Sequence, residues 1–405
     1  MNARDLRILP RLVEIAPQIS AIRRDIHAHP EVSYEEHRTS ELVARLLEGW
    51  GIAVTRGLGG TGVVGTLAAG TSQRAIALRA DLDALPLQEH NHFAHRSTHD
   101  GKMHACGHDG HTAMLLAAAQ YLSESRNFDG RVHFIFQPAE EGGAGAKAMI
   151  DDGLFERFDC EAVFGMHNWP GIPAGKFALR PGPWMASSNE FTIRVEGKGA
   201  HAAMPHLGVD TVMVAVQLAQ ALQGVIARER NPLEPSVLSI TQIHAGDAYN
   251  VIPNEAMLRG TVRTFGIPEL DRIESAMQRL VDGLPPAFGA TASMKFLRNY
   301  PATINHPGET AFCASVLTDL VGTDGVILDR EPTMGAEDFS YFLLEKPGCY
   351  VFIGNGDGDH RDSGHGLGPC TLHNPSYDFN DDLIPLGASY WARLVARRLS
   401  ASNGT

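Results

Sequence analysis

Hydrophobic positions recur with two different periods in the first part of the chain, and this alternation indicates an α/β fold. Apolar residues at helical spacing predict one helix over residues 23–51, ending at Gly51, and another over 111–125. Short apolar runs predict strands at 63–68, 75–83, 131–138 and 162–167, and a further helix is predicted at 144–155. Such alternation is typical of a largely buried sheet covered by helices.

The pattern changes after residue 185. Residues 186–297 predict the order strand, helix, strand, strand, helix, strand, which is the split βαβ or ferredoxin-like arrangement. Asp210 is the expected N-cap of the first of these helices. The α/β pattern then resumes with a strand at 349–356 and an amphipathic helix at 384–399. We therefore predict a discontinuous domain of residues 1–185 and 298–405 and an inserted domain of residues 186–297.

Composition narrows the class of protein. Hydrophobic residues make up 43% and charged residues 20% of the 405 positions, as in ordinary globular enzymes. A net charge of -13 argues against nucleic acid or an anionic membrane as a partner. The first 18 residues interleave charges, and no run approaches the ~20 apolar residues of a membrane span, so we expect a cytoplasmic protein. Five scattered cysteines do not form a disulfide framework, so a thiol beside histidines is better interpreted as a ligand or nucleophile.

One glycine motif suggests a dinucleotide site, but its context favours a turn. The run GLGGTG, Gly57 to Gly62, matches G-x-G-x-x-G, with Asp81 about 20 residues further on. That fingerprint requires a helix after the glycines, whereas the following VVGTLAAG is strand-like. We predict a β-turn here. The sequence contains no G-x-S-x-G elbow, phosphate loop or H-E-x-x-H motif.

The stretch MHACGHDGHTA is a candidate metal site. Cys106 and His108 stand two apart, just before a helix predicted to begin near Asp109, so two soft ligands converge from one loop. A helix N-terminus should lower the pKa of the thiol and favour the thiolate. His111 lies inside the helix, where packing or capping is as plausible as ligation. We expect a structural loop role for His104 and a capping or supporting role for Asp109.

Further candidate ligands follow predicted strands. Glu140 and Glu141 end one strand and His167 ends another, at positions where α/β sheets build their sites. Adjacent carboxylates in an extended segment point in different directions, so one can bind metal while the other transfers a proton. The alternative is that both acids cap the next helix. His373, in TLHNPSYDFND, completes a set of five ligands, which suits two ions sharing a bridging group better than one closed zinc site.

Two loops are rich in histidine without an obvious role. Residues 90–99 hold four histidines, and residues 356–370 place His360 and His365 among glycines. We interpret both segments as surface or substrate-rim loops, where adventitious metal binding is possible.

Ordered blocks along nearly the whole chain resemble the aminoacylase and hippurate hydrolase family of two-metal amidohydrolases. This family includes the plant indoleacetyl-amino-acid hydrolases and is related to metallo-carboxypeptidases. The blocks are RRDIHAHPEVSYEE, RADLDALP, MHACGHDGHTAM, QPAEEGGAGA, GMHNWP, GKGAHAAMP, YNVIPNEA, GTVRTF, MGAEDFSYF and LHNPSYDFND. The resemblance implies an α/β catalytic domain with a mixed sheet and an inserted ferredoxin-like lid. It also implies a homodimer or homotetramer formed through the lid.

The resemblance also implies roles for individual residues. Two divalent metal ions would be held by Cys106, His108, Glu141, His167 and His373, with Cys106 bridging. Glu140 would be the general base. His201 would contact the substrate and stabilise the oxyanion during catalysis, Asn250 would bind the substrate's carbonyl or carboxylate, and Arg263 is a further substrate-binding candidate. Thiolate and imidazole ligands suit zinc, while manganese, cobalt or nickel are alternatives.

The implied activity is metal-dependent hydrolysis of N-acyl or N-aroyl amino acids, such as hippurate, into a carboxylic acid and a free amino acid. One alternative is a dipeptidase or carboxypeptidase acting on short peptides. A non-enzymatic metal-binding or storage protein, suggested by the 19 histidines, is an alternative of a different class.

Overall fold

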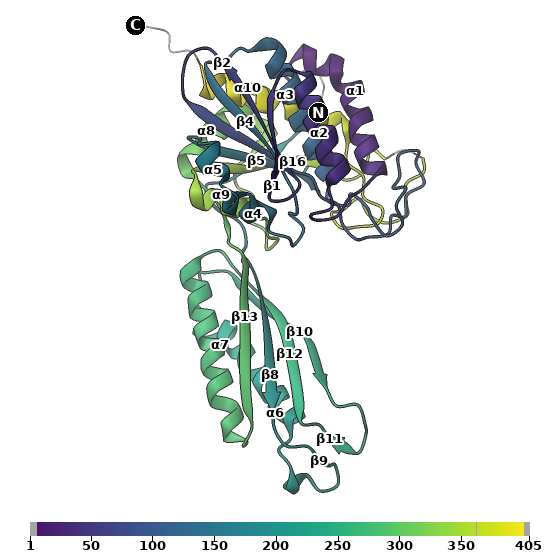
Figure 1. Ribbon diagram of the computed structural model, residues 1–405. Helices are drawn as coiled ribbons and strands as arrows, with labels where there is room; N and C mark the ends of the chain where they lie inside the picture. The colour runs from purple at the N-terminus through teal and green to yellow at the C-terminus, as the bar shows by residue number, and fades with distance from the viewer. Residues whose placement is uncertain (1–5, 362, 401–405) are drawn as a thin grey trace. The chain divides into compact units, whose positions relative to one another are not determined.

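The computed structural model describes residues 6–361 and 363–400, and they form two compact units. The larger unit contains the described residues up to Trp184, then Ile304–Glu331, then the described residues from Tyr341 onward. The smaller unit contains Met185–Thr303 and the short segment Pro332–Ser340. Figure 1 shows most of the smaller unit in teal to green.

The larger unit is built on an eight-stranded mixed sheet. In chain order its strands are β1 (Ala53–Leu58), β2 (Gly62–Ala69), β3 (Ala75–Asp81), β4 (Gly130–Gln137), β5 (Val163–Pro170), β6 (Phe177–Ala178), β15 (Val326–Ile327) and β16 (Gly348–Gly356). In space they follow the order β1-β2-β4-β3-β5-β16-β6-β15. The central strands β4, β3, β5 and β16 run parallel, so their carboxyl ends share one edge of the sheet.

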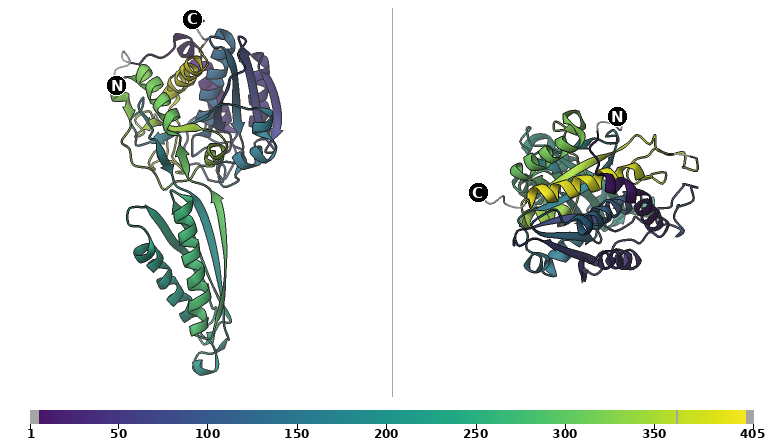
Figure 2. Two further views of the ribbon diagram at one scale, coloured as in Figure 1. Left: turned by 90° about the vertical axis from the view of Figure 1, so that its left-hand side faces the viewer. Right: turned by 90° about the horizontal axis from the view of Figure 1, so that it is seen from above.

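Helices pack against this sheet. They are α1 (Pro10–Ala28), α2 (His37–Gly49), α3 (His108–Ser125), α4 (Gly145–Asp151), α5 (Leu154–Arg157), α8 (Pro307–Val321) and α10 (Ile384–Arg398). Helix α3 contacts β3, β4 and β5, and α1 and α10 pack on α3 (Figures 1 and 2). It is apolar around most of its circumference because neighbours cover it on nearly every side. The predicted α/β class with a mixed sheet is confirmed.

Two predicted helices were wrong in their bounds. The segment 23–51 is not one helix, because α1 ends at Ala28 and α2 begins only at His37. Pro30 disfavours helical geometry at the residue before it, and His29 accordingly has φ -127° and ψ 59°. The segment 144–155 is likewise divided into α4 and α5 by Gly153, whose φ is +83°. By contrast, the predicted turn at Gly57 to Gly62 is confirmed, since it joins the antiparallel strands β1 and β2.

The smaller unit has the predicted βαββαβ order. Its main elements are β8 (Ser188–Glu196), α6 (Thr211–Gly224), β10 (Ser236–Ala245), β12 (Glu255–Thr264), α7 (Ile267–Ala287) and β13 (Thr291–Tyr300). The strands form an antiparallel sheet in the order β10-β12-β8-β13, which is the ferredoxin-like topology. Asp210 is confirmed as the N-cap of α6, because its side chain accepts a hydrogen bond from the Met213 backbone N–H at 3.1 Å.

Shorter elements complete the chain. Strands β9 (Ala200–His201) and β11 (Val251–Ile252) pair with each other in the smaller unit. Where the chain passes between the units it forms α9 (Phe339–Glu345) and the paired strands β7 (Gly182–Met185) and β14 (Thr303–Asn305).

Helix α6 departs from the expectation that no segment of the chain approaches the length and apolar character of a membrane span. With the π-helical turn Val225–Glu229 that follows it, the helix is long and apolar enough to cross a membrane by length and composition. Only 33% of that segment is buried. Its buried residues, including Leu218 and Leu222, belong to the core of the smaller unit. The helix therefore packs on its own sheet and also exposes apolar side chains.

Candidate metal centre

The five predicted ligands come from separate segments of the larger unit. Cys106 precedes α3 and His108 is its first residue, Glu141 follows β4, His167 lies on β5, and His373 lies in the loop before α10. The structure brings them together in two groups, in each of which all ligand atoms lie within 4.8 Å of one another. These groups are Cys106, His108 and His167, and Cys106, Glu141 and His373. The thiol is common to both groups.

Individual distances show how tight the cluster is. The Cys106 Sγ lies 3.4 Å from the Nε2 of His167. The Nε2 of His373 lies 3.1 Å from the Oε1 of Glu141. His373 has a φ of +60°, and its backbone N–H donates to the Ala105 carbonyl at 2.8 Å, which fixes its loop beside the segment that carries Cys106.

Gly107 allows Cys106 and His108 to stand side by side. It is the N-cap of α3 with a φ of +90°. A Cβ at this position would lie 2.3 Å from the Nδ2 of Asn168 and 2.4 Å from the hydroxyl oxygen of Tyr377. Asn168 needs that space, because its Nδ2 donates to the Cys106 carbonyl at 2.7 Å while its Oδ1 accepts from the Tyr377 hydroxyl at 2.7 Å. A side chain at position 107 would therefore displace the ligand loop.

Asp83 orients His108. Its Oδ1 accepts a hydrogen bond from the His108 Nδ1 at 3.2 Å, and its Oδ2 accepts from the Glu141 backbone N–H at 2.9 Å and the Ser33 hydroxyl at 2.8 Å. The His108 Nε2 is buried and has no hydrogen-bond partner among the described residues. An orphaned buried nitrogen is costly unless something binds it. Together with sulfur, imidazole and carboxylate donors, it fits a divalent metal ion.

His111 supports the site rather than joining it. Its Nδ1 donates to the Oδ1 of Asp81 at 2.7 Å, and its Nε2 accepts from the Asn168 backbone N–H at 2.8 Å. Both ring nitrogens therefore have hydrogen-bond partners, which favours the packing role, and the ring also belongs to a group with Asp81 and His108 whose ligand atoms lie within 4.8 Å of one another. Burial opposes ionisation of Asp81, but His108, His111 and Arg79 hold the pKa of its carboxyl well below its usual range.

The expected effect of the α3 N-terminus on Cys106 was wrong. Burial, and then the carboxylates of Glu141 and Glu140, raise the pKa of the Cys106 thiol well above its usual value. Both effects act against the partial positive charge of the helix end. A divalent cation held by this sulfur must therefore displace its proton.

Glu140 lies beside the ligands without capping a helix. It is only 7% exposed, and its carboxylate belongs to a group with His108 and Glu141 whose ligand atoms lie within 4.8 Å of one another. Helix α4 begins only at Gly145 and has no side-chain cap. The alternative that the acidic pair caps this helix is therefore wrong.

The predicted substrate-binding residues all belong to the smaller unit. His201 lies on β9, and the backbone carbonyl of Asn250, just before β11, accepts from the Ala202 N–H at 2.9 Å. His201, on β9, and Asn250, just before the paired strand β11, are thus neighbours. Arg263 lies on β12, opposite Val237 of β10, and burial lowers the pKa of its guanidinium.

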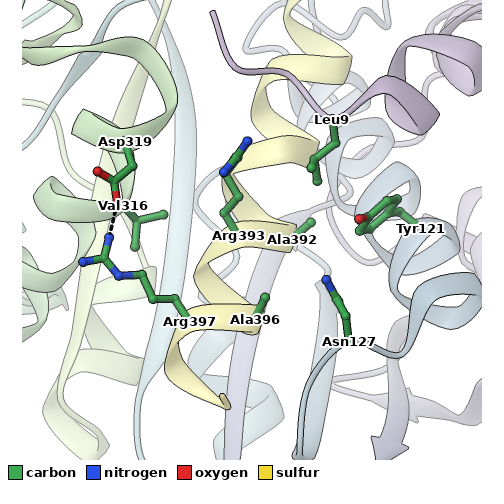
Figure 3. Close-up of a pocket in the computed structure, with 9 residues that line it drawn as sticks. All are labelled: Leu9, Tyr121, Asn127, Val316, Asp319, Ala392, Arg393, Ala396 and Arg397. Atoms are coloured by element: carbon green, nitrogen blue, oxygen red, sulfur yellow. Dashed lines mark hydrogen bonds and ion pairs between the residues drawn. The ribbon is translucent and has the colours of Figure 1, made fainter. Parts of the chain in front are cut away.

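The larger unit also has a cavity that is separate from the predicted ligands. A cavity of about 320 Å³ is lined by residues from the α1 start, α3, α8 and α10, and it contains none of the predicted site residues (Figure 3). Arg397 at its rim is paired with Asp319 at 2.6 Å. This cavity therefore contributes no group to the ligand cluster.

Comparison with known proteins agrees with this geometry. The sequence profile of the peptidase family M20/M25/M40 matches residues 77–397. The chain belongs to this family. It is 39% identical to the hippurate hydrolase of Campylobacter jejuni over 97% of this chain and 100% of that protein. It is 40% identical to thermostable carboxypeptidase 1 of Saccharolobus solfataricus over 95% of this chain and 96% of that protein.

A solved structure of the same family has the same fold. The Bacillus subtilis YXEP protein, a dinuclear metal-binding peptidase of the M20 family, superposes with a TM-score of 0.82. It is 31% identical in sequence, and the match covers 96% of this chain and 99% of that one. The family resemblance inferred from the sequence blocks is confirmed.

Behind its ligand loop this M20 chain carries a buried charge network that the sequence did not reveal. The Oδ2 of Asp109 accepts from the His27 Nδ1 at 2.9 Å and from the Arg23 Nη1 at 3.3 Å, while the Nε2 of His27 lies 3.2 Å from the Oε1 of Glu89. Burial lowers the pKa of His27, but the carboxylates of Asp109 and Glu89 raise it to about 10. Asp109 thus anchors the first turn of α3 to α1 instead of capping α3.

His104 is buried, and the histidine-rich loops combine exposed and partly buried histidines: His90, His92 and His99 are exposed, as expected for a surface loop. His104 is 1% exposed, neither of its ring nitrogens has a hydrogen-bond partner among the described residues, and burial lowers its pKa to about 4. The two loops bind each other, since the Gly366 N–H donates to the Oδ1 of Asn91 at 2.8 Å. His95 and His365 lie 3.5 and 3.1 Å from the Asp378 carboxylate, so these two are partly buried structural groups, not surface ones.

Proposed function

We propose that this chain is a metal-dependent amidohydrolase that cleaves N-acyl or N-aroyl amino acids, such as hippurate, into a carboxylic acid and a free amino acid. The observation that carries the proposal is the pair of three-donor groups sharing Cys106, with the buried Glu140 beside them. Membership of the M20 family and near full-length similarity to a hippurate hydrolase support the same conclusion.

In this proposal two divalent ions would be held by two groups of ligands that share Cys106. His108 and His167 complete one set of protein ligands, and Glu141 and His373 complete the other. Zinc suits the sulfur and imidazole donors, while manganese, cobalt and nickel are the alternatives. When bound, such ions supply positive charge that lowers the pKa of a coordinated water and polarises the amide carbonyl.

Glu140 moves the proton. Its carboxylate takes a proton from the attacking water and returns it to the leaving amide nitrogen, so that the products are a carboxylic acid and a free amine. Because Glu140 is only 7% exposed, bulk water has little access to that proton during the transfer.

The smaller unit supplies contacts to the substrate. The Nδ1 of His201 accepts a hydrogen bond from the Ala203 N–H at 3.1 Å, so a neutral His201 carries its proton on Nε2. That N–H can donate to the oxyanion that forms on the carbonyl oxygen. Asn250 and Arg263 bind the substrate's carbonyl or carboxylate.

We also assign self-association to the smaller unit, giving a homodimer or homotetramer. Helix α6 exposes Val212, Met213 and Val216 on the face away from its sheet, at 37%, 52% and 37%. Adjacent exposed apolar side chains of this kind mark interaction surfaces. Mass measurement by light scattering on the wild type and on Met213→Glu tests the assignment, and a monomeric wild type would exclude it.

A reducing compartment such as the cytoplasm suits the protein. All five cysteines are free and buried. A small organic molecule, rather than nucleic acid or a membrane, is the expected partner.

The test is a substrate panel on metal-reconstituted protein. Hydrolysis of hippurate or N-acetyl amino acids, about two ions per chain by elemental analysis, and loss of activity on chelation are the expected results. Preference for dipeptides would instead support the peptidase alternative, which the similarity to a carboxypeptidase favours. Many loosely held ions with no hydrolysis would support metal storage and refute the proposal.

A further inference from the structure

An aromatic stack stands directly beside one of the proposed ligands. Trp169 follows His167 by two residues on β5, so both side chains lie on the same face of the sheet. Their ring centroids are 6.0 Å apart. Phe352 of the neighbouring strand β16 stacks on Trp169 with centroids 4.0 Å apart and planes inclined by 15°.

The stack is held from the inside of the larger unit. The ring of Trp184 lies 4.4 Å from that of Phe352, and these two side chains are only 0% and 1% exposed. Trp169, by contrast, is only partly buried. Packed aromatic rings fix one another in position, so the indole of Trp169 is a rigid surface whose use in binding costs little conformational entropy.

Trp169 lies beside the place where the carbonyl of the substrate would bind. The carbonyl carbon attacked by water must lie at the ligand cluster, where the His167 Nε2 is 3.4 Å from the Cys106 Sγ. The acyl group is attached to that carbon, so its first atoms lie within a few ångströms of the cluster. An aromatic ring bonded directly to the carbonyl, as in a benzoyl group, is flat and can pack on an indole, whereas an acetyl methyl offers far less surface.

A cation is also present at this surface. The Arg330 guanidinium carbon lies 6.0 Å from the centre of the Trp169 ring. This distance is at the outer limit of a cation–π interaction. A second π system placed near Trp169 would therefore also be attracted to the guanidinium.

We propose that Trp169 selects the acyl group, and that the aromatic ring of an N-aroyl amino acid packs against its indole while the amide carbonyl lies at the ligand cluster. The inference rests on the proposed function. It names the substrate class as N-aroyl amino acids in preference to N-acetyl amino acids.

The test compares kcat/KM for hippurate and N-acetylglycine within each of four proteins: wild type, Trp169→Leu, Trp169→Phe and Trp50→Leu. Trp50 is the matched control, because it is also a partly buried tryptophan that packs on the core, at the end of α2. The ratio is measured within each variant, so a partial loss of folded or metal-loaded protein cancels.

Trp169→Leu should lower the hippurate to N-acetylglycine ratio about tenfold, since one aromatic contact is removed. Trp169→Phe should keep most of the preference and Trp50→Leu should keep all of it. An unchanged ratio in Trp169→Leu would overturn the inference and leave the proposed function standing.

A binding measurement distinguishes failure of the proposed function from failure of the inference about Trp169. If the wild type hydrolyses neither compound, the proposed function fails, and calorimetric titration of benzoate into metal-loaded wild type and Trp169→Leu then tests the aromatic surface alone. Weaker benzoate binding to the variant supports the inference. Equal binding, or none to the wild type, overturns it.

Discussion

Replacing His27 by asparagine tests the buried charge network behind the ligand loop. The His27 ring bridges Asp109 at 2.9 Å and Glu89 at 3.2 Å, and the three side chains are 0%, 0% and 3% exposed. Asparagine is shorter and uncharged, so both carboxylates lose a positive partner while they stay buried. Breaking a buried ion pair in this way costs about 3 to 5 kcal/mol.

The lower part of that range is expected here. Arg23 still donates to Asp109, and Glu89 still accepts from the Asn91 Nδ2 at 2.8 Å and the Ser97 N–H at 2.6 Å. A loss of about 3 kcal/mol should lower the Tm by roughly 6 to 12 °C. His29→Asn, at the residue just after the same helix, is the control, because that side chain is 36% exposed and should change stability by only about 0.5 kcal/mol.

The difference should also depend on pH. The pKa of His27 is raised to about 10 from its ordinary value of 6.5, so its charge stabilises the folded state fully below 6.5. This contribution is lost as the pH rises through the folded value. Urea unfolding at pH 6, 8 and 10 should therefore show a gap between wild type and His27→Asn that narrows at the highest pH. A gap near zero at pH 6, or one that widens with pH, would refute the reasoning.

Three further predictions concern the ligand cluster. Glu140→Gln should keep two ions per chain and lose about 10³-fold in kcat, and near-normal turnover would exclude Glu140 as the base. Asp83→Asn should weaken metal binding about 10- to 100-fold in a chelator competition, because Asp83 holds both His108 and the Glu141 backbone, and unchanged affinity would contradict that role. Metal binding should release protons, and metal affinity should rise with pH, because burial raises the pKa of the Cys106 thiol and a bound cation must replace its proton. Calorimetry in buffers of different ionisation enthalpy measures this proton release.

The spacing of apolar residues predicted most helices and strands of this fold, because the helical and strand periods depend only on residues that are close together in the sequence. The break at His29 and Pro30 was missed because the apolar spacing continues on both sides of it. The effect of proline on the preceding residue was the signal that could have placed it. The βαββαβ order of the smaller unit needed only the sequence of periods, and it was recovered.

The site divides in the same way. Cys106, His108, Glu141, His167 and His373 could be selected from the ordered blocks and from their places at strand ends. Asp83 follows β3 as Glu141 follows β4, so the rule about strand ends could have found it as well.

The charge network had no comparable signal in the sequence. His27 lies 82 residues before Asp109 and 62 residues before Glu89 in the sequence. Only the folded chain shows that these three groups meet. The raised pKa of Cys106 depends on burial, which local sequence does not report.

The sulfur of Cys106 should also make the protein sensitive to thiophilic metal ions and to peroxide. Thiophilic ions such as cadmium or mercury prefer thiolate over carboxylate donors, so they should displace the cations that Cys106 would hold in the proposed site. Peroxide would convert the thiolate first to a sulfenic acid, which thiols can repair, and then to a sulfinic acid, which they cannot. In the proposed site, metal loading would create this vulnerability, because burial raises the pKa of the metal-free thiol, and oxidation of the one sulfur would damage both groups of donors.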